Sequence, residues 1–152
     1  MLINEALIEL DLKAGTKEDA IKELADIALK EGRINDIKQY TDCVFKRENE
    51  YTTGVGNNIA IPHGKSIAVL EPTIIFGKSA SGIDWNSLDD EPVNIIFLLA
   101  VPKESVGNLH LKILSMLSRK LMNEDFVTVL KNSNSKLEIL EIINSIQKKL
   151  EE

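Results

Sequence analysis

The feature of this sequence that most constrains its fold is an unbroken apolar run from Ile95 to Val101. The run is far shorter than the roughly 20 residues that a membrane-spanning helix requires, and its length suits a β-strand. Successive side chains of a strand point to opposite faces, so a strand that is apolar at every position must be covered on both sides. We therefore predict that residues 93–101 form the central strand of a covered sheet.

The remaining segments mix short strands with amphipathic helices. Strands are predicted over residues 7–12, 59–61 and 73–78. Helices are predicted from a capping box at Thr16 and Asp19 to Gly32, and over residues 35–48, 107–121, 124–131 and from Ser135 onwards. Elements in this order predict an α/β fold, a helix–sheet–helix sandwich with a mixed β-sheet, that makes one domain of residues 1–152.

The composition of the chain narrows the possible partners. The 152 residues carry a formal net charge of −6, whereas binding to nucleic acids or to anionic membranes needs clustered Lys and Arg. The N-terminal sequence lacks a signal-peptide pattern, and the single Cys43 cannot form an internal disulfide. We expect a cytoplasmic protein without nucleic-acid binding or membrane insertion, in which Cys43 is a buried and inert thiol.

Several common sites are missing from the sequence. There is no Gly-x-x-x-x-Gly-Lys-Ser/Thr loop, no Gly-x-Ser-x-Gly elbow and no Gly-x-Gly-x-x-Gly dinucleotide motif. The chain has two histidines and one cysteine, and none of them form a pair at metal-ligand spacing. We therefore expect neither a metal nor another cofactor.

His63 is the first candidate for chemistry. It follows the predicted strand 59–61, which Pro62 ends, and it precedes Gly64. This position puts the imidazole at the end of a strand, where α/β sheets hold ligands, and the small Gly64 should leave it uncrowded. Unprotonated imidazole is a nucleophile at neutral pH, and its attack on phosphorus would give a phosphohistidine. An ordinary turn histidine fits the same position.

His110 is the second candidate, near the start of the predicted helix 107–121. A helix N-terminus favours anions, so His110 could donate a hydrogen bond to a phosphoryl oxygen. Helical spacing also places it on the same face as Ile113, Leu114 and Leu117, which fits a core histidine bonded to a carbonyl.

Arg47 and the glycine loop that follows it could bind the same anion. Arg47 ends the predicted helix 35–48 and offers a fork of N–H donors, or else it is a solvated surface charge. Thr52, Thr53 and Gly54 open the loop and could hold phosphate through hydroxyl and N–H groups. Capping of the turn explains the two threonines equally well.

Together these segments resemble the enzyme IIA domain of the fructose–mannitol type, from the bacterial phosphoenolpyruvate-dependent sugar phosphotransferase system. The resemblance extends over nearly the whole chain, and the stretch from Thr53 to His63 is its most specific part. It is carried by Arg47–Glu48, Thr53–Asn57, Ile59–Lys65, Gly82–Trp85, Pro92–Val93, and Asn108–Leu111 with Leu114.

The resemblance implies a function and roles for the candidate residues. It implies a phosphohistidine at His63, formed on Nε2, with support from Arg47 and His110. The implied donor is the phosphorylated carrier HPr, and the implied acceptor is a cysteine of an enzyme IIB domain, which passes the group to a sugar entering through enzyme IIC. Fructose or a related sugar or hexitol is the expected substrate of the whole system. The implied fold is a helix–sheet–helix sandwich.

Two alternatives stay open at this point. Family members without transport partners use the phosphorylation of the same histidine as a regulatory signal, and an unrelated small-molecule module could bind an anion between His63 and His110. We also expect a shallow apolar patch for partner proteins among Val55, Ile59, Val106 and Leu109. One departure from the family pattern is Asp90, which stands where a glycine is usual and must tolerate a left-handed turn.

Overall fold

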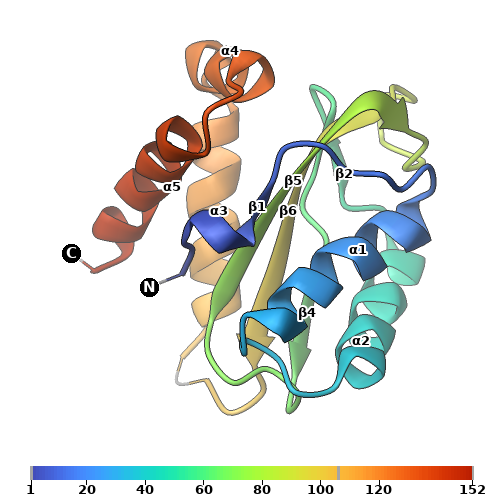
Figure 1. The fold of residues 1–152 in the computed structure, drawn as a ribbon, viewed down its shortest axis with the longest axis vertical. Coiled ribbons are helices and arrows are strands. Elements are labelled where there is room, and N and C mark those ends of the chain that lie inside the picture. The colour runs from blue at the N-terminus through green and yellow to red at the C-terminus, as the bar shows by residue number, and fades with distance from the viewer. Residues whose placement is uncertain (1, 106, 152) are drawn as a thin grey trace.

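The computed structural model describes residues 2–105 and 107–151 and has a mixed sheet between two layers of helices (Figure 1). In these residues the strands are β1 (Ile8–Glu9), β2 (Gly54–Gly56), β3 (Ile59–Ala60), β4 (His63–Ser66), β5 (Thr73–Ile83) and β6 (Val93–Pro102). The helices are the short 3-10 helix η1 (Glu5–Leu7), α1 (Lys17–Lys30), α2 (Ile37–Glu50), α3 (Leu109–Leu121), α4 (Glu124–Asn132) and α5 (Lys136–Glu151). Helices α1 and α2 cover one face and α3, α4 and α5 lie on the other, which confirms the predicted sandwich.

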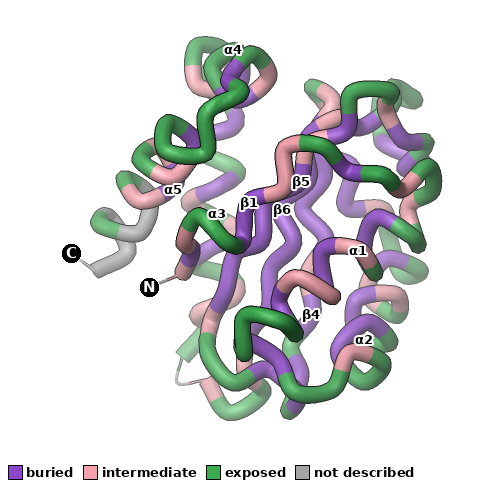
Figure 2. The backbone as a smooth tube through the Cα atoms, in the orientation of Figure 1, coloured by how far each residue is buried: buried purple, intermediate pink, exposed green. Residues whose placement is uncertain are grey.

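Strand β6 is the centre of the sheet, as the apolar run predicts. It pairs antiparallel with β5 and parallel with both β3 and β4. Along β6 every residue from Ile95 to Val101 is at most 1% exposed, so both of its faces are covered (Figure 2). Burying one such side chain contributes roughly 1.5–3 kcal/mol relative to leaving it in water.

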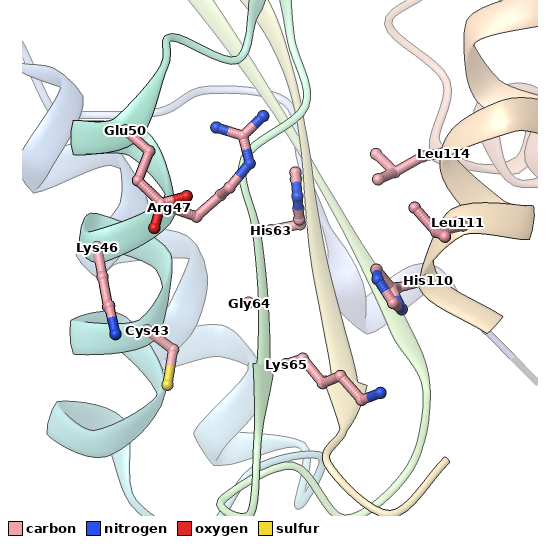
Figure 3. A pocket seen from close by; sticks show the side chains of 10 residues that line it. All are labelled: Cys43, Lys46, Arg47, Glu50, His63, Gly64, Lys65, His110, Leu111 and Leu114. Atoms are coloured by element: carbon pink, nitrogen blue, oxygen red, sulfur yellow. The ribbon is translucent and has the colours of Figure 1, made fainter. Parts of the chain in front are cut away.

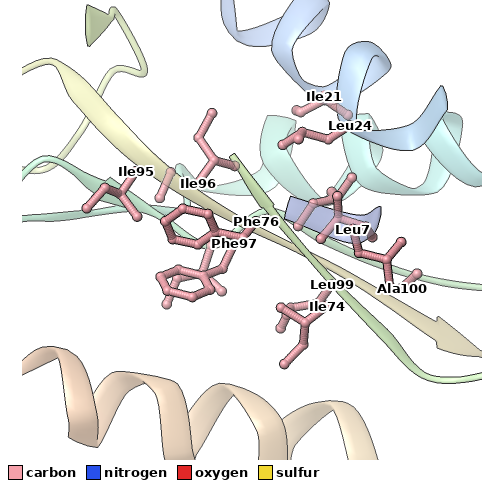
Figure 4. Packing of buried hydrophobic residues seen from close by; sticks show 14 of the residues in the cluster. Leu7, Ile21, Leu24, Ile74, Phe76, Ile95, Ile96, Phe97, Leu99 and Ala100 are labelled. Atoms are coloured by element: carbon pink, nitrogen blue, oxygen red, sulfur yellow. The ribbon is translucent and has the colours of Figure 1, made fainter. Parts of the chain in front are cut away.

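The core is one cluster that joins the sheet to both helical layers (Figure 4). Phe76 of β5 and Phe97 of β6 meet edge to face, with ring centroids 5.3 Å apart. On the α1 side of the sheet, an added Cβ at Gly77 would lie 3.0 Å from a methyl group of Leu24, so β5 and α1 are in close contact. The sheet is therefore fixed from both sides, and it gives the strands next to β6 rigid positions.

Local capping decides where the first two helices begin. The Thr16 side chain accepts a hydrogen bond of 3.1 Å from the Asp19 N–H, as the capping box predicts. Helix α2 begins two residues later than expected because Asp36 is its N-cap, accepting from the Gln39 N–H at 3.0 Å. Its end at Glu50 is also two residues later, so Arg47 lies in the last turn.

The structure corrects the bounds of two predicted strands and adds a third strand. Of residues 7–12 only Ile8 and Glu9 are in a strand, and β5 continues through Ile83 rather than ending at residue 78. The prediction also missed β4. Although Pro62 ends β3, its carbonyl accepts from the Leu99 N–H at 3.0 Å, so the chain stays alongside β6 and pairing resumes at His63. His63 is thus the first residue of β4, rather than a loop residue beyond the end of a strand.

The glycine loop expected over residues 51–58 contains a small hairpin. Strands β2 and β3 pair antiparallel around Asn57 and Asn58, whose φ angles are +56° and +65°. Two consecutive left-handed residues are typical of the tight turns that join hairpin strands. Asp90, which stands where the family usually has glycine, also has a left-handed φ of +60°, so aspartate keeps that turn.

Candidate functional site

His63, Arg47 and His110 line one open cleft of about 540 Å³ (Figure 3). His63 comes from the start of β4, Arg47 from the last turn of α2 and His110 from the first turn of α3. The cleft is also lined by Cys43, Lys46, Glu50, Gly64, Lys65, Leu111 and Leu114. The fold therefore brings together the three residues that the sequence analysis singled out for chemistry.

A single hydrogen bond fixes the chemical state of the half-buried His63 ring. Its Nδ1 lies 3.1 Å from the carbonyl oxygen of Ile61. A carbonyl can only accept, so Nδ1 carries the proton when the ring is neutral. The other nitrogen, Nε2, then has a free lone pair, which is the requirement for a nucleophile.

The surroundings of His63 favour this neutral form. Burial lowers the pKa of His63, and the positive charges of Arg47 and of protonated His110 lower it as well. The Ile61 carbonyl and the carboxylate of Glu48 act in the opposite direction, but the pKa remains below its usual value. The ring is therefore mainly unprotonated at neutral pH.

The guanidinium of Arg47 is held beside the imidazole by the main chain. Its Nη1 donates a 2.7 Å hydrogen bond to the carbonyl of Tyr51. In Figure 3 the side chain reaches from α2 toward His63, and its guanidinium lies beside the upper end of the ring. A guanidinium in this position has donors left for the oxygens of an anion.

His110 lies at the margin of the apolar face of α3 rather than in the core. Ile113 and Leu117 are fully buried, whereas His110 is half-buried and borders the cleft. Its Nδ1 is shielded from solvent and has no hydrogen-bond partner among the described residues. Burial and the nearby charge of Lys65 lower the pKa of His110, so its ring too is mainly neutral at pH 7.

The polar groups at the start of the glycine loop are engaged inside the protein. The Thr52 hydroxyl donates to the Trp85 carbonyl at 3.0 Å and accepts from the Gly54 N–H at 3.1 Å. The Thr53 N–H and hydroxyl both donate to Glu48. These groups would have to exchange partners before they could bind a phosphate, so the role predicted for Thr52, Thr53 and Gly54 stays a prediction.

Sequence reasoning gave Glu48 no role, yet its carboxylate organises the glycine loop. The side chain is 3% exposed and accepts from Thr53, from Trp85 Nε1 at 3.3 Å and from Lys17 Nζ at 3.3 Å. The sequence signal for its burial is helical spacing. Glu48 follows the apolar Tyr40 and Val44 at intervals of four residues, which places it on the same face of α2, and all three residues are buried.

Gly64 and Cys43 both border the cleft, and Cys43 is less buried than predicted. The Cα of Gly64 also faces α2, where an added Cβ would lie 2.9 Å from a Val44 methyl and 3.3 Å from the Tyr40 ring. Cys43 is half-buried and borders the cleft, because it stands one helical turn before Arg47 on α2.

The predicted apolar patch is only partly on the surface. Val55 is 48% exposed and Leu109 is half-buried, but Ile59 is 1% exposed as part of β3 and cannot contact a partner. Val106 lies outside the described residues. Leu111, which lines the cleft, is 52% exposed, and Tyr51 and Leu88 beside the cleft are 60% and 61% exposed.

Among the residues that the structure describes, no group of three or more His, Cys, Asp or Glu side chains is arranged to hold a metal ion. None of the helices in residues 2–105 and 107–151 has the length and apolar character to cross a membrane.

Solved structures place this fold among the IIA domains of phosphotransferase systems. The nitrogen regulatory protein IIA-Ntr from Neisseria meningitidis superposes with a TM-score of 0.85 at 29% identity, covering 93% of this chain and 95% of that one. The IIA mannitol protein in its complex with phosphorylated IIB, from Escherichia coli, gives a TM-score of 0.80 at 25% identity, covering 94% and 97%.

The sequence gives the same result at the level of the family. The family model described as "Phosphoenolpyruvate-dependent sugar phosphotransferase system, EIIA 2" matches residues 1–146, and the chain belongs to this family. A fructose-specific EIIA component from Haloferax volcanii is 43% identical over 140 residues, which span 92% of this chain and 90% of the relative. The protein is thus a phosphoryl carrier, the EIIA-type component of a phosphotransferase system.

Proposed function

We propose that Nε2 of His63 accepts a phosphoryl group from phosphorylated HPr and passes it to a cysteine of an enzyme IIB domain. The observation that carries this proposal is the bond from Nδ1 to the Ile61 carbonyl, which leaves Nε2 as the nitrogen with a free lone pair. The ring borders the cleft that Arg47 and His110 also line, so a cationic and a polar side chain face the same space as the ring.

The reaction conserves the phosphoryl group through two similar exchanges. In the first, a bond forms between phosphorus and Nε2 of His63 while the phosphorus–nitrogen bond of the donor breaks. In the second, the cysteine thiolate of the acceptor attacks phosphorus and the bond to Nε2 breaks, which returns the neutral ring. Each transition state spreads negative charge over three oxygens, so positioning and electrostatics supply the catalysis.

Arg47 and His110 are suited to that charge. The guanidinium can donate two parallel hydrogen bonds to phosphoryl oxygens, and a neutral imidazole at the start of α3 can donate one. Their stabilisation of the phosphorylated form has to stay moderate, because the group must leave again for the next protein. A ring nitrogen is a suitable carrier since it is a good leaving group once the acceptor engages.

The relatives support a transport role with an enzyme IIB partner. A fructose-specific component is 43% identical to this chain, and the matched mannitol structure holds IIA together with phosphorylated IIB. We propose that the sugar of the complete system is fructose or a related sugar or hexitol. The alternative is regulation through phosphorylation-dependent protein binding, which the likeness to the nitrogen regulatory protein favours.

The deciding experiment incubates the protein with phosphorylated HPr and follows its intact mass. Wild type should gain one phosphate, and His63→Ala should gain none while it keeps the far-ultraviolet circular dichroism of wild type. A phosphate that still appears on His63→Ala would place the acceptor elsewhere. No gain on wild type would reject the carrier role of His63 and favour the anion-binding module.

A second assay separates transport from regulation. The phosphorylated protein is mixed with a panel of enzyme IIB domains, and loss of phosphate from His63 is timed for each. Rapid transfer to a fructose-type IIB domain supports transport. Failure with every IIB domain, together with a binding partner that distinguishes the phosphorylated from the free form, would support the regulatory alternative.

A further inference from the structure

A buried carboxylate lies behind the glycine loop, and the carrier mechanism described above does not use it. Both oxygens of Glu48 are occupied: Oε2 accepts from the Thr53 N–H at 3.0 Å and from Lys17 Nζ at 3.3 Å, and Oε1 accepts from the Thr53 hydroxyl and from Trp85 Nε1 at 3.3 Å. These partners come from α1, from the glycine loop and from the segment after β5. Glu48 thus connects three parts of the chain that are far apart in sequence.

Two more hydrogen bonds continue from this carboxylate to the reacting ring. The Thr53 carbonyl accepts from the Ile61 N–H at 3.0 Å. The Ile61 carbonyl in turn accepts from Nδ1 of His63 at 3.1 Å. Thr53 is therefore held by Glu48 on one side and holds Ile61 on the other, and Ile61 is the residue that determines which nitrogen of His63 carries the proton.

We propose that Glu48 is a positioning residue for phosphoryl transfer, which fixes the Nδ1-protonated form of His63 through Thr53 and Ile61. The inference rests on the proposed function of His63 as the acceptor. Glu48 is not among the residues that line the cleft, so it acts on the reacting ring from behind. Its effect is on the orientation and tautomer of the nucleophile.

The chemistry of the contacts explains why a carboxylate is needed at this position. The Thr53 N–H, the Lys17 ammonium and the Trp85 indole N–H are all donors, and a carboxylate can accept from all three. The indole N–H also lies 3.3 Å from the hydroxyl oxygen of Thr53. A glutamine at position 48 would turn its amide N–H₂ toward at least one of these donors. Because the site is buried, water cannot repair the mismatch, and Thr53 would shift away from its present position.

Glu48 also acts on His63 through its charge. The charged or titratable groups that influence the ring are Arg47 on the same helix, His110 on α3, and Glu48 itself. The first two lower the pKa of His63, and Glu48 raises it. Removal of the Glu48 carboxylate should lower the pKa of His63 further. A substitution of Thr53 that leaves Glu48 in place should keep the pKa-raising effect of the Glu48 charge.

The test is Glu48→Gln, with Asp42→Asn as the matched control. Asp42 is an exposed residue of the same helix and pairs with Lys38, so its change removes one negative charge without touching the buried contacts. Nitrogen-15 NMR of the imidazole reports the tautomer of His63, and a titration reports its pKa. In Glu48→Gln we expect a mixed tautomer, a lower pKa and phosphate acceptance slowed by up to about 100-fold. Asp42→Asn should match wild type in all three.

A second variant decides the matter if Glu48→Gln fails to fold. Thr53→Val keeps the shape of the side chain and the backbone bond to Glu48, but it removes the hydroxyl contact, so the same change of tautomer should appear to a smaller extent. A fully Nδ1-protonated ring in each variant that folds would overturn the inference, even where stability is reduced. The tautomer of His63 is measured without any phosphate present. A negative result there is therefore distinct from a failure of the proposed function, which is tested by phosphate acceptance of the wild-type protein.

Discussion

At the scale of single residues, the two nitrogens of His63 have different surroundings. Nδ1 is bonded to a main-chain carbonyl, while the ring borders a cleft lined by Arg47 and His110. The difference follows from the position of the residue at the start of β4, two residues after Ile61. A histidine in a free turn would exchange between both tautomers and both orientations.

The pH dependence of phosphate acceptance should reflect the lowered pKa of His63. Protonation removes the nucleophilic lone pair, so acceptance requires the neutral ring. Because burial and Arg47 lower the pKa, more than half of the rings remain neutral at pH 6.5, where an unperturbed histidine is about half protonated. We expect an NMR titration midpoint below 6.5 in the folded protein and a return to about 6.5 in urea. A folded midpoint at or above the urea value would contradict this prediction.

The role of His110 can be separated from that of His63. His110→Ala keeps the nucleophile, so the variant should still accept phosphate from phosphorylated HPr. Onward transfer to an enzyme IIB domain should slow by roughly 100-fold, the lower end of the losses measured when one preorganised donor is removed. Rapid-quench measurement of the transfer step checks this, and an unchanged rate would show that His110 only packs against the cleft.

The residues of the site differ in how far the sequence predicts them. His63, Arg47 and His110 belong to recognisable local segments, and the structure brings them to one cleft. Glu48 is different, because its partners Lys17 and Trp85 are 31 and 37 residues away. Such contacts depend on how α1, α2 and the segment after β5 pack together, and no local pattern encodes that arrangement.

At the scale of elements, the contact between α2 and β4 sets the distance between Arg47 and His63. Gly64 lies in that contact, where an added Cβ would be 3.3 Å from the main-chain nitrogen of Val44. Gly64→Ala should therefore push α2 outward, lowering the free energy of unfolding by about 1–3 kcal/mol and slowing phosphate acceptance.

Gly15→Ala is the matched control for this prediction. An added Cβ at Gly15 meets nothing within 4 Å, so the free energy of unfolding should change by less than about 1 kcal/mol. Urea unfolding of both variants and of wild type measures the difference. Equal stability of Gly64→Ala and Gly15→Ala would mean that the contact between α2 and β4 can relax without cost.

The strands illustrate what periodicity can and cannot predict. The continuous apolar run identified β6, because a strand buried on both faces needs no further context. Strand β4 was missed, since Pro62 suggests an end and His63–Ser66 has the composition of a turn. Its pairing depends on β6 already being in place, with the Pro62 carbonyl bonded to Leu99.

At the scale of the whole molecule, the chain should unfold in one step. The buried cluster includes residues of the sheet and of both helical layers, so no layer keeps a core of its own when the others detach. Trp85 is the single tryptophan of the chain and is fully buried beside Glu48, whereas circular dichroism reports all the helices. Urea transitions followed by the two signals should coincide. Two separate midpoints would show that residues 1–152 contain more than one unfolding unit.

The group that orients the ring of His63 is a peptide carbonyl, and this has a consequence for how the protein can evolve. Every amino acid supplies the same C=O, so no codon change at position 61 deletes the acceptor. Genetic drift can alter the preferred tautomer only by displacing the backbone. The choice of nitrogen is therefore inherited with the path of the chain, and a side chain such as that of Glu48 can change it only by moving that path.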